Sequence, residues 1–344
     1  MPRTNRQWVL ARRPQGDLDP SRPDCFELRT TQAPEPGPGQ ALVRVDWLSI
    51  DPTQRGWLND SPNYRAPVGL GEVMRGGGVG EVVASNAPAL PVGTHVYDEL
   101  GWQDYAIGTS EGLYGIHPVP PGVEPRSMLG LFGATGLTAY FGMTDVGRPE
   151  PAEPAETVVV SAAAGATGAI AAQIAKARDA RVIGIAGGER KCRWAVETAG
   201  LDACIDHTSD DVPAELARLA PNGIDVYFDT VGGDLLEAVL DRLALHARIV
   251  VCGGVASGYR GEMPATGPRN YLQLGLRRAR MEGFVFLDHV DRFPEAFDAL
   301  ATWSANGDIV LEESVAKDLT QAPAALAGLF RGHNLGKQLV RVRG

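Results

Sequence analysis

The spacing of apolar residues changes between Gly130 and Gly142. Before this stretch, short strand-like runs such as Gln40–Trp47, Gly78–Val83 and Thr94–Tyr97 alternate with turns rich in proline and glycine. This pattern predicts a compact, mostly antiparallel β domain. Within the stretch the apolar residues take a helical spacing, so we place the crossing into a second domain there.

From Thr157 onward, strand-like and helical segments alternate. The expected strands are Thr157–Ser161, Arg181–Ala186, Ala203–Asp206, Ile224–Asp229, Arg248–Cys252 and Met281–Phe286. The expected helices are a run ending at Arg178, Glu189–Ala199, Val212–Ala220, Leu235–Leu243 and Asp291–Asn306. This alternation predicts an α/β fold with a doubly wound parallel sheet over residues 131–301. The strand-like tail is expected to rejoin the first domain, which then comprises residues 1–130 and 302–344.

The first strand of this sheet runs into a glycine turn. The turn, Ala163-Ala164-Gly165-Ala166-Thr167-Gly168, has the spacing of a dinucleotide fingerprint with alanine at its first position. Gly165 would let the backbone approach a pyrophosphate, and Gly168 would let helix and strand pack closely. The helix that follows offers free N–H groups to phosphates. The alternative is a glycine-rich helix start that binds nothing.

The residues after the second strand indicate which dinucleotide is bound. An NAD site would place an acidic residue there for the ribose hydroxyls. The chain has Gly187-Gly188-Glu189-Arg190-Lys191 instead, with two cations directly after the acid. Because a 2′-phosphate needs cations, this favours NADPH, with Lys191 the better candidate and Arg190 the second. The alternative is that both cations lie on an exposed helical turn.

Composition limits the classes of partner. The 344 residues carry a net charge of −10 with a pI near 5.2, which argues against a nucleic-acid or anionic-membrane surface. We find no apolar run of signal-peptide or membrane-span length. The four cysteines are scattered without a C-x-x-C pair, so neither a disulfide framework nor a zinc site is expected. The sequence therefore predicts a soluble, cytoplasmic protein.

Several segments resemble one family nearly end to end. They are Ile50–Arg55, Gly71–Gly77, Gly136–Gly142, Ser161–Gly168, Tyr227–Gly233, Val251–Gly254, Met281–Phe284 and His333–Lys337. With these motifs the chain resembles zinc-independent medium-chain dehydrogenases/reductases of the leukotriene B4 12-hydroxydehydrogenase, prostaglandin reductase and 2-alkenal (enone) reductase group. The resemblance implies a GroES-like β domain built from both chain ends and a central Rossmann domain.

The resemblance also implies a set of cofactor contacts. They map onto Ala164, Gly165, Ala166, Thr167, Gly168, Gly188, Lys191, His207, Thr230, Cys252, Gly253, Phe284, Val285, Phe286 and Asn334. The three residues Phe284–Phe286 would lie beside the nicotinamide. Three positions depart from the family. His207 replaces a tyrosine that grips the ribose phosphate, and Thr230 stands where many members have asparagine. Tyr259 lies one residue further from Cys252-Gly253 than the tyrosine that follows this stretch in the family.

The implied reaction moves a hydride from NADPH to the β-carbon of an α,β-unsaturated carbonyl compound. Charge then grows on the carbonyl oxygen, and a hydrogen-bond donor stabilises the enolate. Tyr259 is the cofactor-side candidate for this donor and Tyr64 the substrate-side one, although each is also consistent with an ordinary loop or surface tyrosine. Arg55 would orient the loop or meet the substrate, with a structural ion pair as the alternative. The loops at 55–68 and 259–270 are expected to set the size of the pocket.

No metal is expected in this chemistry. Gly71-Glu72 stands where zinc-dependent relatives carry Gly-His-Glu, and the chain has no four-cysteine lobe. The main hypothesis is therefore an NADPH-dependent enone or enal reductase, homodimeric by resemblance, with a small-molecule substrate. A zinc-free NADPH quinone oxidoreductase and a non-catalytic NADPH-binding protein are the alternatives.

Overall fold

The computed structural model describes residues 3–22, 24–61, 64–111, 115–257, 259 and 267–343. Internal contacts divide the chain into two units. Unit 1 comprises Met1–Gly130, Gly258–Glu262 and Glu313–Gly344, and unit 2 comprises Leu131–Ser257 and Met263–Glu312. The second long boundary falls after Glu312 rather than before residue 302. Val310, just before this boundary, is joined to unit 2, because the Gln173 side chain donates to Val310 O at 3.0 Å and accepts from Val310 N at 2.8 Å.

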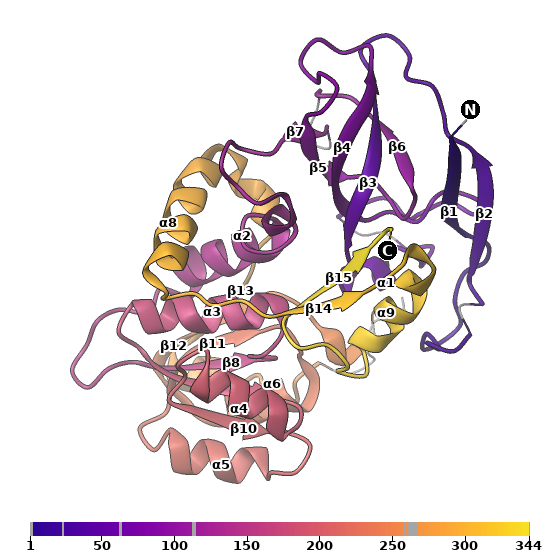
Figure 1. The fold of residues 1–344 in the computed structure, drawn as a ribbon. Coiled ribbons are helices and arrows are strands. Elements are labelled where there is room, and N and C mark those ends of the chain that lie inside the picture. The colour runs from indigo at the N-terminus through magenta and orange to yellow at the C-terminus, as the bar shows by residue number, and fades with distance from the viewer. Residues whose placement is uncertain are drawn as a thin grey trace. The chain divides into compact units, whose positions relative to one another are not determined.

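Unit 2 contains one six-stranded sheet in which every neighbouring pair is parallel, in the order β10-β9-β8-β11-β12-β13. The strands are β8 (Thr157–Ser161), β9 (Arg181–Ala186), β10 (Ala203–Asp206), β11 (Ile224–Asp229), β12 (Leu243–Val251) and β13 (Arg280–Gly283). The α-helices are α2 (Ala134–Phe141), α3 (Ala166–Ala177), α4 (Glu189–Glu197), α5 (Val212–Leu219), α6 (Gly233–Leu240), α7 (Gln273–Arg277) and α8 (Phe293–Asn306) (Figure 1). The predicted doubly wound parallel sheet is confirmed.

The sheet forms here because its central strands are apolar on both faces. Val158, Val159 and Val160 of β8 are fully buried. One face packs with apolar residues of α5 and α6 in a single cluster, and α3 packs against β8 and β9. Burial on both sides favours β-branched runs of this kind, which is why the sequence pattern located the strands.

Unit 1 is built mainly from antiparallel strands. A seven-stranded sheet has the order β14-β15-β3-β4-β5-β7 with β6 beside β3, and β1 pairs with β2. The strands are β1 (Thr4–Leu10), β2 (Phe26–Gln32), β3 (Ala41–Ser49), β4 (Gly77–Ser85), β5 (His95–Glu99), β6 (Tyr105–Gly108), β7 (His117–Pro118), β14 (Glu313–Ala316) and β15 (Lys337–Arg341). Two α-helices, α1 (Thr53–Gly56) and α9 (Ala322–Leu329), belong to this unit.

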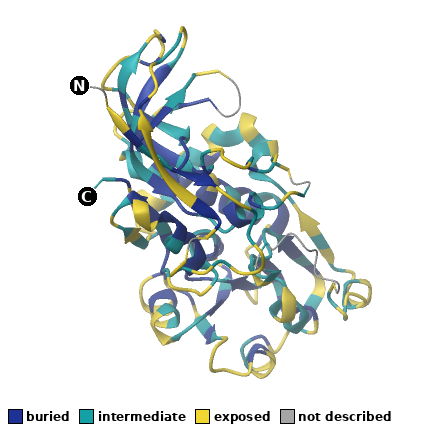
Figure 2. Ribbon diagram, turned by 90° about the vertical axis from the view of Figure 1, so that its right-hand side faces the viewer, coloured by how far each residue is buried: buried dark blue, intermediate teal, exposed yellow. Residues whose placement is uncertain are grey.

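Both chain ends contribute to the core of unit 1. Trp8 and Leu48 share one buried cluster with Leu326 and Val340 from the tail, and β15 pairs with β3 antiparallel. Figure 2 shows buried residues along these strands and along the sheet of unit 2. A GroES-like β domain made from both ends is therefore the observed arrangement.

Three local predictions need correction. The tail contains the helix α9. Pro323 does not prevent it, because the residue stands in the first turn, where a proline costs no hydrogen bond. Leu243 is the first residue of β12 and not the end of a helix. The short helix α7 was not predicted at all.

The cysteines also differ from expectation. Cys192 on α4 and Cys204 on β10 are joined by a disulfide, with their Cα atoms 5.2 Å apart. The two meet because α4 follows β9 and β10 pairs with β9, an adjacency that a separation of 12 residues does not reveal. Cys25 and Cys252 are free.

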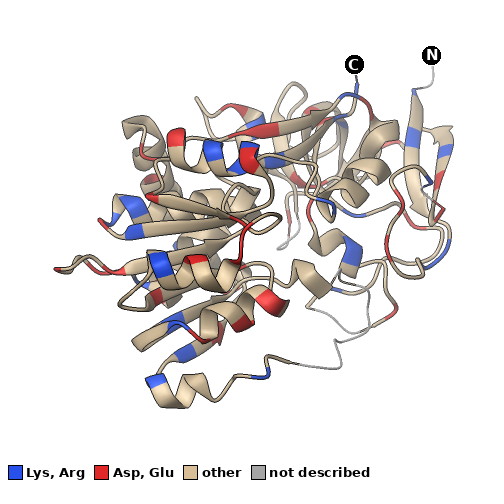
Figure 3. Ribbon diagram, turned by 90° about the horizontal axis from the view of Figure 1, so that it is seen from below, with Lys and Arg blue, Asp and Glu red and all other residues tan. Residues whose placement is uncertain are grey.

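Charges of both signs are interspersed on the helices and loops in the view of Figure 3. Among the described residues, no helix is both long and apolar enough to cross a membrane.

Candidate cofactor and catalytic site

The candidate cofactor residues of unit 2 share one property, which is that they follow the carboxyl ends of the parallel strands. They are Ala164–Gly168 after β8, Gly188 and Lys191 after β9, His207 after β10, Thr230 after β11, Cys252 and Gly253 after β12, and Phe284–Phe286 after β13. In a parallel sheet these ends lie on the same edge, which is where open α/β sheets bind ligands.

The glycine turn is built as the fingerprint requires. Ala162 takes a left-handed conformation with φ of 46°, and Gly165 N donates to Ala162 O at 2.7 Å. A Cβ atom on Gly168 would lie 2.4 Å from Ala162 O, so a side chain there would displace the turn. No side chain of the described residues caps the N-terminus of α3. Its first N–H groups are therefore suited to an anion.

The turn after β9 is fastened to the end of β10. Gly188, with φ of 93°, donates its N–H to Asp206 Oδ1 at 2.8 Å. The same carboxylate accepts from the hydroxyl and the N–H of Thr208. The Thr208 hydroxyl is the largest of the effects that lower the pKa of Asp206 to about 2. Sequence reasoning missed Asp206, although an acid at the end of a parallel strand was the available signal.

Lys191 is a half-buried cation on the first turn of α4. Burial, and then the positive charge of Arg190, lower the pKa of its ammonium group. Within the residues that the structure describes, no carboxylate forms an ion pair with it. The nearby Glu189 is exposed and pairs with Arg193 on the next turn. Within the described residues, the charge of Lys191 is therefore not neutralised by a carboxylate.

The ends of β8 and β11 are joined by a buried network around Asp229. Its carboxylate accepts from Tyr227 OH at 3.0 Å and from the N–H groups of Val231 and Gly232 at 2.9 Å each. Burial is the largest effect on this group and raises its pKa. Ser161 Oγ in turn accepts from Thr230 N at 2.8 Å. Asp229 was also missed, and it too is the last residue of its strand.

The residues after β12 and β13 line the same edge with apolar groups. Cys252 N and Gly253 N donate to Asp229 O at 2.8 and 3.1 Å. Burial raises the pKa of the Cys252 thiol to about 12, which makes it a poor nucleophile. Phe286 stacks on Phe293 with ring centroids 5.9 Å apart. Phe284 packs so closely on Gly142 that a Cβ there would lie 2.8 Å from its Cζ.

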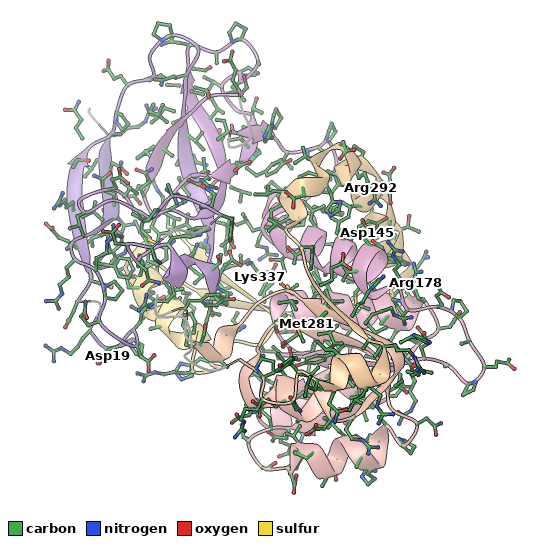
Figure 4. The ribbon with its side chains drawn as sticks, turned by 180° about the vertical axis from the view of Figure 1, so that it is seen from behind. Asp19, Asp145, Arg178, Met281, Arg292 and Lys337 are labelled. Atoms are coloured by element: carbon green, nitrogen blue, oxygen red, sulfur yellow. A yellow bond between two sulfur atoms is a disulfide. The ribbon has the colours of Figure 1, made fainter. Side chains whose placement is uncertain are left out.

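A charged brace supports this aromatic group. Arg292 Nη1 lies 2.5 Å from Asp145 Oδ2, and the same guanidinium pairs with Glu295 at 2.9 Å. Figure 4 labels Arg292 and Asp145 within unit 2. The segment that carries Phe286 and Phe293 is thereby tied to Asp145 in the π-helix Gly142–Gly147, which continues α2.

The remaining candidates, Arg55, Tyr64, Tyr259 and Asn334, belong to unit 1. Tyr259 is held by its backbone, because its carbonyl accepts from Asn59 Nδ2 at 2.8 Å and from Arg55 Nη1 at 3.4 Å. Its φ of 48° is left-handed, and its ring meets Phe330 edge-on at 6.3 Å. Most of the loop 259–270 that surrounds it lies outside the described residues.

Arg55 and Tyr64 contrast in burial. Arg55 is 1% exposed and donates to Gly16 O at 2.8 Å and to Asn59 Oδ1 at 2.7 Å. Tyr64 is 57% exposed, and its hydroxyl lies 2.9 Å from Thr53 Oγ1. Arg55 is thus placed to orient its neighbours, whereas Tyr64 is largely exposed to solvent.

Two motifs that are far apart in sequence meet at Lys337. The buried Lys337, labelled in Figure 4, forms an ion pair with Asp51 just before α1. Asn334 lies in the turn before β15, and its side chain donates to Gly336 O at 2.8 Å. The pair fixes the start of the segment that carries Thr53, Arg55 and Asn59.

Comparison with known proteins agrees with this arrangement. The family model described as the N-terminal domain of oxidoreductase matches residues 6–116, and the one described as zinc-binding dehydrogenase matches residues 166–302. A protein of Escherichia coli (strain K12) named NADPH-dependent curcumin reductase is 41% identical over 99% of this chain and 97% of its own length. The chain belongs to the zinc-independent medium-chain dehydrogenases/reductases.

Two further relatives of this medium-chain dehydrogenase/reductase are informative. A protein of Nicotiana tabacum named 2-alkenal reductase (NADP(+)-dependent) is 36% identical over 89% of this chain and 88% of its own length. The crystal structure of CurA from Vibrio vulnificus in complex with NADPH has a TM-score of 0.90 and 41% identity, over 98% of this chain and 99% of that one. Within the described part of the chain, no group of three or more His, Cys, Asp or Glu residues could hold a metal ion.

Proposed function

We propose that this protein is an NADPH-dependent reductase of the C=C bond of α,β-unsaturated ketones and aldehydes. The observation that carries the cofactor assignment is the half-buried Lys191, which has no carboxylate partner within the described residues. A half-buried ammonium group has lost part of its hydration. The oxygens of a 2′-phosphate can replace those contacts with charged hydrogen bonds, so this cation fits a 2′-phosphate.

The residues present fit the rest of NADPH. Gly165, Gly168 and the first turn of α3 would hold the pyrophosphate. Thr230, Cys252 and Gly253 would line the nicotinamide ribose, and Phe284–Phe286 would exclude water beside the ring. When bound, NADPH supplies the hydride that the β-carbon of the substrate receives.

The chain's own contribution to the reaction is a hydrogen-bond donor. Negative charge grows on the carbonyl oxygen of the substrate, and a donor already aimed at that oxygen stabilises it. We assign this role to the hydroxyl of Tyr259, with Tyr64 as the substrate-side tyrosine. Arg55 and Asn59 act as positioning residues, because they fasten the Tyr259 carbonyl.

The substrate class is supported by what similar proteins are called. The Escherichia coli and tobacco relatives are named a curcumin reductase and a 2-alkenal reductase. Both names refer to compounds with a C=C bond conjugated to a carbonyl group. We further propose a homodimer, which sedimentation equilibrium would test against a monomer.

A screen of acceptors tests the proposal. Oxidation of NADPH is followed with 2-alkenals, cyclic enones, aryl enones and quinones at matched concentrations. Turnover of enones or enals well above that of quinones supports the proposal, and a preference for quinones makes the protein a quinone oxidoreductase. Tight NADPH binding without turnover of any acceptor would make it a binding protein. Because the assay also reports the Michaelis constant for NADPH, it separates failure of the cofactor assignment from failure of the substrate assignment.

A further inference from the structure

The disulfide of unit 2 lies beside the turn assigned to the 2′-phosphate. Cys192 directly follows Lys191 on the first turn of α4, and Cys204 is on β10, two residues before Asp206. The bond therefore ties the helix that carries the phosphate-binding cation to the edge strand of the sheet.

A second tether joins the same two elements. The Asp206 carboxylate accepts the N–H of Gly188, which is the residue just before α4. One tether is a hydrogen bond at the start of the helix, and the other is a covalent bond one turn later. Only the covalent one depends on the redox state of its surroundings.

Both cysteines are half-buried rather than enclosed, and β10 is the outer strand of the sheet. Cys192 stands in the first turn of a helix and between two cations in sequence, Lys191 and Arg193. The reactive form in thiol–disulfide exchange is the thiolate. At the two other cysteines burial disfavours that form, because it raises the pKa of Cys25 to about 11 and that of Cys252 to about 12.

We propose that Cys192 and Cys204 form a reversible thiol–disulfide modification site whose oxidised state fixes Lys191 and the Gly188 turn for NADPH. The inference rests on the proposed 2′-phosphate site. When the disulfide is reduced, α4 is no longer held to β10 at that position. Part of the free energy of NADPH binding is then needed to order the Gly188 turn. Affinity for NADPH is then lower in the reduced protein.

The exchange partner is a low-molecular-weight thiol and its disulfide, such as glutathione. One cysteine thiolate attacks a sulfur of glutathione disulfide, which forms a mixed disulfide and releases one glutathione thiolate. The second cysteine thiolate attacks the protein sulfur of this mixed disulfide and releases the second glutathione. Two protein thiols are thereby oxidised to one disulfide, and one glutathione disulfide is reduced to two glutathione molecules.

The test measures NADPH binding at defined redox states. The full-length protein is equilibrated with mixtures of glutathione and its disulfide, and free thiols are alkylated and counted by mass spectrometry. NADPH dissociation constants are measured on the same samples from nicotinamide fluorescence. We expect Cys192 and Cys204 to be protected together in the oxidised samples, and NADPH to bind about two- to tenfold more weakly to the reduced protein.

Variants separate the tether from other effects. Cys192→Ser and Cys204→Ser should each bind NADPH as weakly as the reduced protein at every glutathione ratio. In Cys25→Ala the affinity for NADPH should still depend on the glutathione ratio. The inference is overturned if the dissociation constant is the same with the bond intact and reduced, or if the pair is not oxidised at any glutathione ratio.

Lys191→Ala distinguishes this failure from failure of the proposed function. If the variant binds NADPH more weakly relative to NADH, while the redox state of the wild type does not change its affinity for NADPH, only the redox inference is wrong. If the variant does not affect the preference for NADPH, the proposed phosphate site is wrong and the inference falls with it.

Discussion

The two units carry their candidate residues in different ways. In unit 2 the candidates lie in the turns and first helical turns that follow the strands of one parallel sheet, so the backbone brings the group to one edge. In unit 1 the position of Tyr259 depends on side chains, because Asn59 and Arg55 fasten its carbonyl from about 200 positions earlier in the chain. The proposed cofactor site thus depends on strand order, whereas the proposed catalytic group depends on individual hydrogen bonds. Variants in the two units should therefore fail in different ways.

The largest effect is expected at Gly168. In Gly168→Val the new side chain would meet Ala162 O, which a Cβ alone approaches to 2.4 Å. The free energy of unfolding should fall by about 1–3 kcal/mol, and NADPH binding should be lost with the turn. Urea unfolding and nicotinamide fluorescence measure the two. Gly275→Ala, at a helical glycine with open space around it, is the control and should leave NADPH binding unchanged. Normal NADPH binding by Gly168→Val would contradict the account of the turn.

Tyr259→Phe addresses unit 1. Loss of a donor to the developing oxyanion should lower kcat on the best enone about 100-fold or more, with little change in NADPH binding. Steady-state kinetics at saturating NADPH measure this. Tyr271→Phe, at an exposed tyrosine of unit 2, is the control. If both Tyr259→Phe and Tyr64→Phe leave turnover unchanged, the tyrosine assignments are wrong.

Lys191→Ala should affect the cofactor only. Loss of a charged hydrogen bond to the 2′-phosphate should raise the Michaelis constant for NADPH about 10- to 100-fold and leave that for NADH nearly unchanged. Lys176→Ala, at a lysine already paired with Asp202, should change neither constant. Equal effects of Lys191→Ala on the Michaelis constants for both cofactors would show that Lys191 does not bind the 2′-phosphate.

Asn59→Ala should have a smaller effect, confined to unit 1. One hydrogen bond to the Tyr259 carbonyl is lost, so kcat/KM for the enone should fall about fivefold while the dissociation constant of NADPH stays the same. Asn86→Ala is a matched control, because Asn86 also donates to a backbone carbonyl, that of Pro36. Weaker NADPH binding by Asn59→Ala would show that the two units are not separable in this way.

The smallest effect concerns acid stability. Its hydrogen bonds lower the pKa of Asp206 from 3.8 to about 2, so its contribution to stability is present above about pH 4 and is lost as the pH falls towards 2. The free-energy difference between the wild type and Asp206→Asn should therefore shrink on acidification. Unfolding by urea at several pH values between about 5 and 3 measures it, and a constant difference would contradict the assignment.

The sequence predicted the sheet of unit 2 well because fully buried parallel strands need β-branched runs such as Val158–Val160. The glycine turn was predictable because Gly168 faces backbone so closely that a side chain there would displace the turn. Lys191 was proposed because the strand before it, β9, ends at Ala186 without an acidic residue.

The contacts between elements could not be predicted in this way. The Cys192–Cys204 bond depends on the pairing of β9 with β10, and the carboxylates of Asp206 and Asp229 act on neighbouring turns. The sequence predicts that Arg55 orients the loop or meets the substrate, with a structural ion pair as the alternative, but it does not reveal the burial of this side chain beside Gly16 and Asn59. Residue type and spacing predict which residues the strands and turns place at the site. They do not predict the side-chain contacts between distant elements that hold those residues in place.

The site of hydride delivery tests the central claim most directly. The enzyme is supplied with a simple enone and with NADPH that carries deuterium at the transferable position of nicotinamide C4, and the product is analysed by mass spectrometry and NMR. The account predicts a saturated ketone with deuterium on the β-carbon and an intact carbonyl group. An allylic alcohol with deuterium on the carbonyl carbon would contradict it.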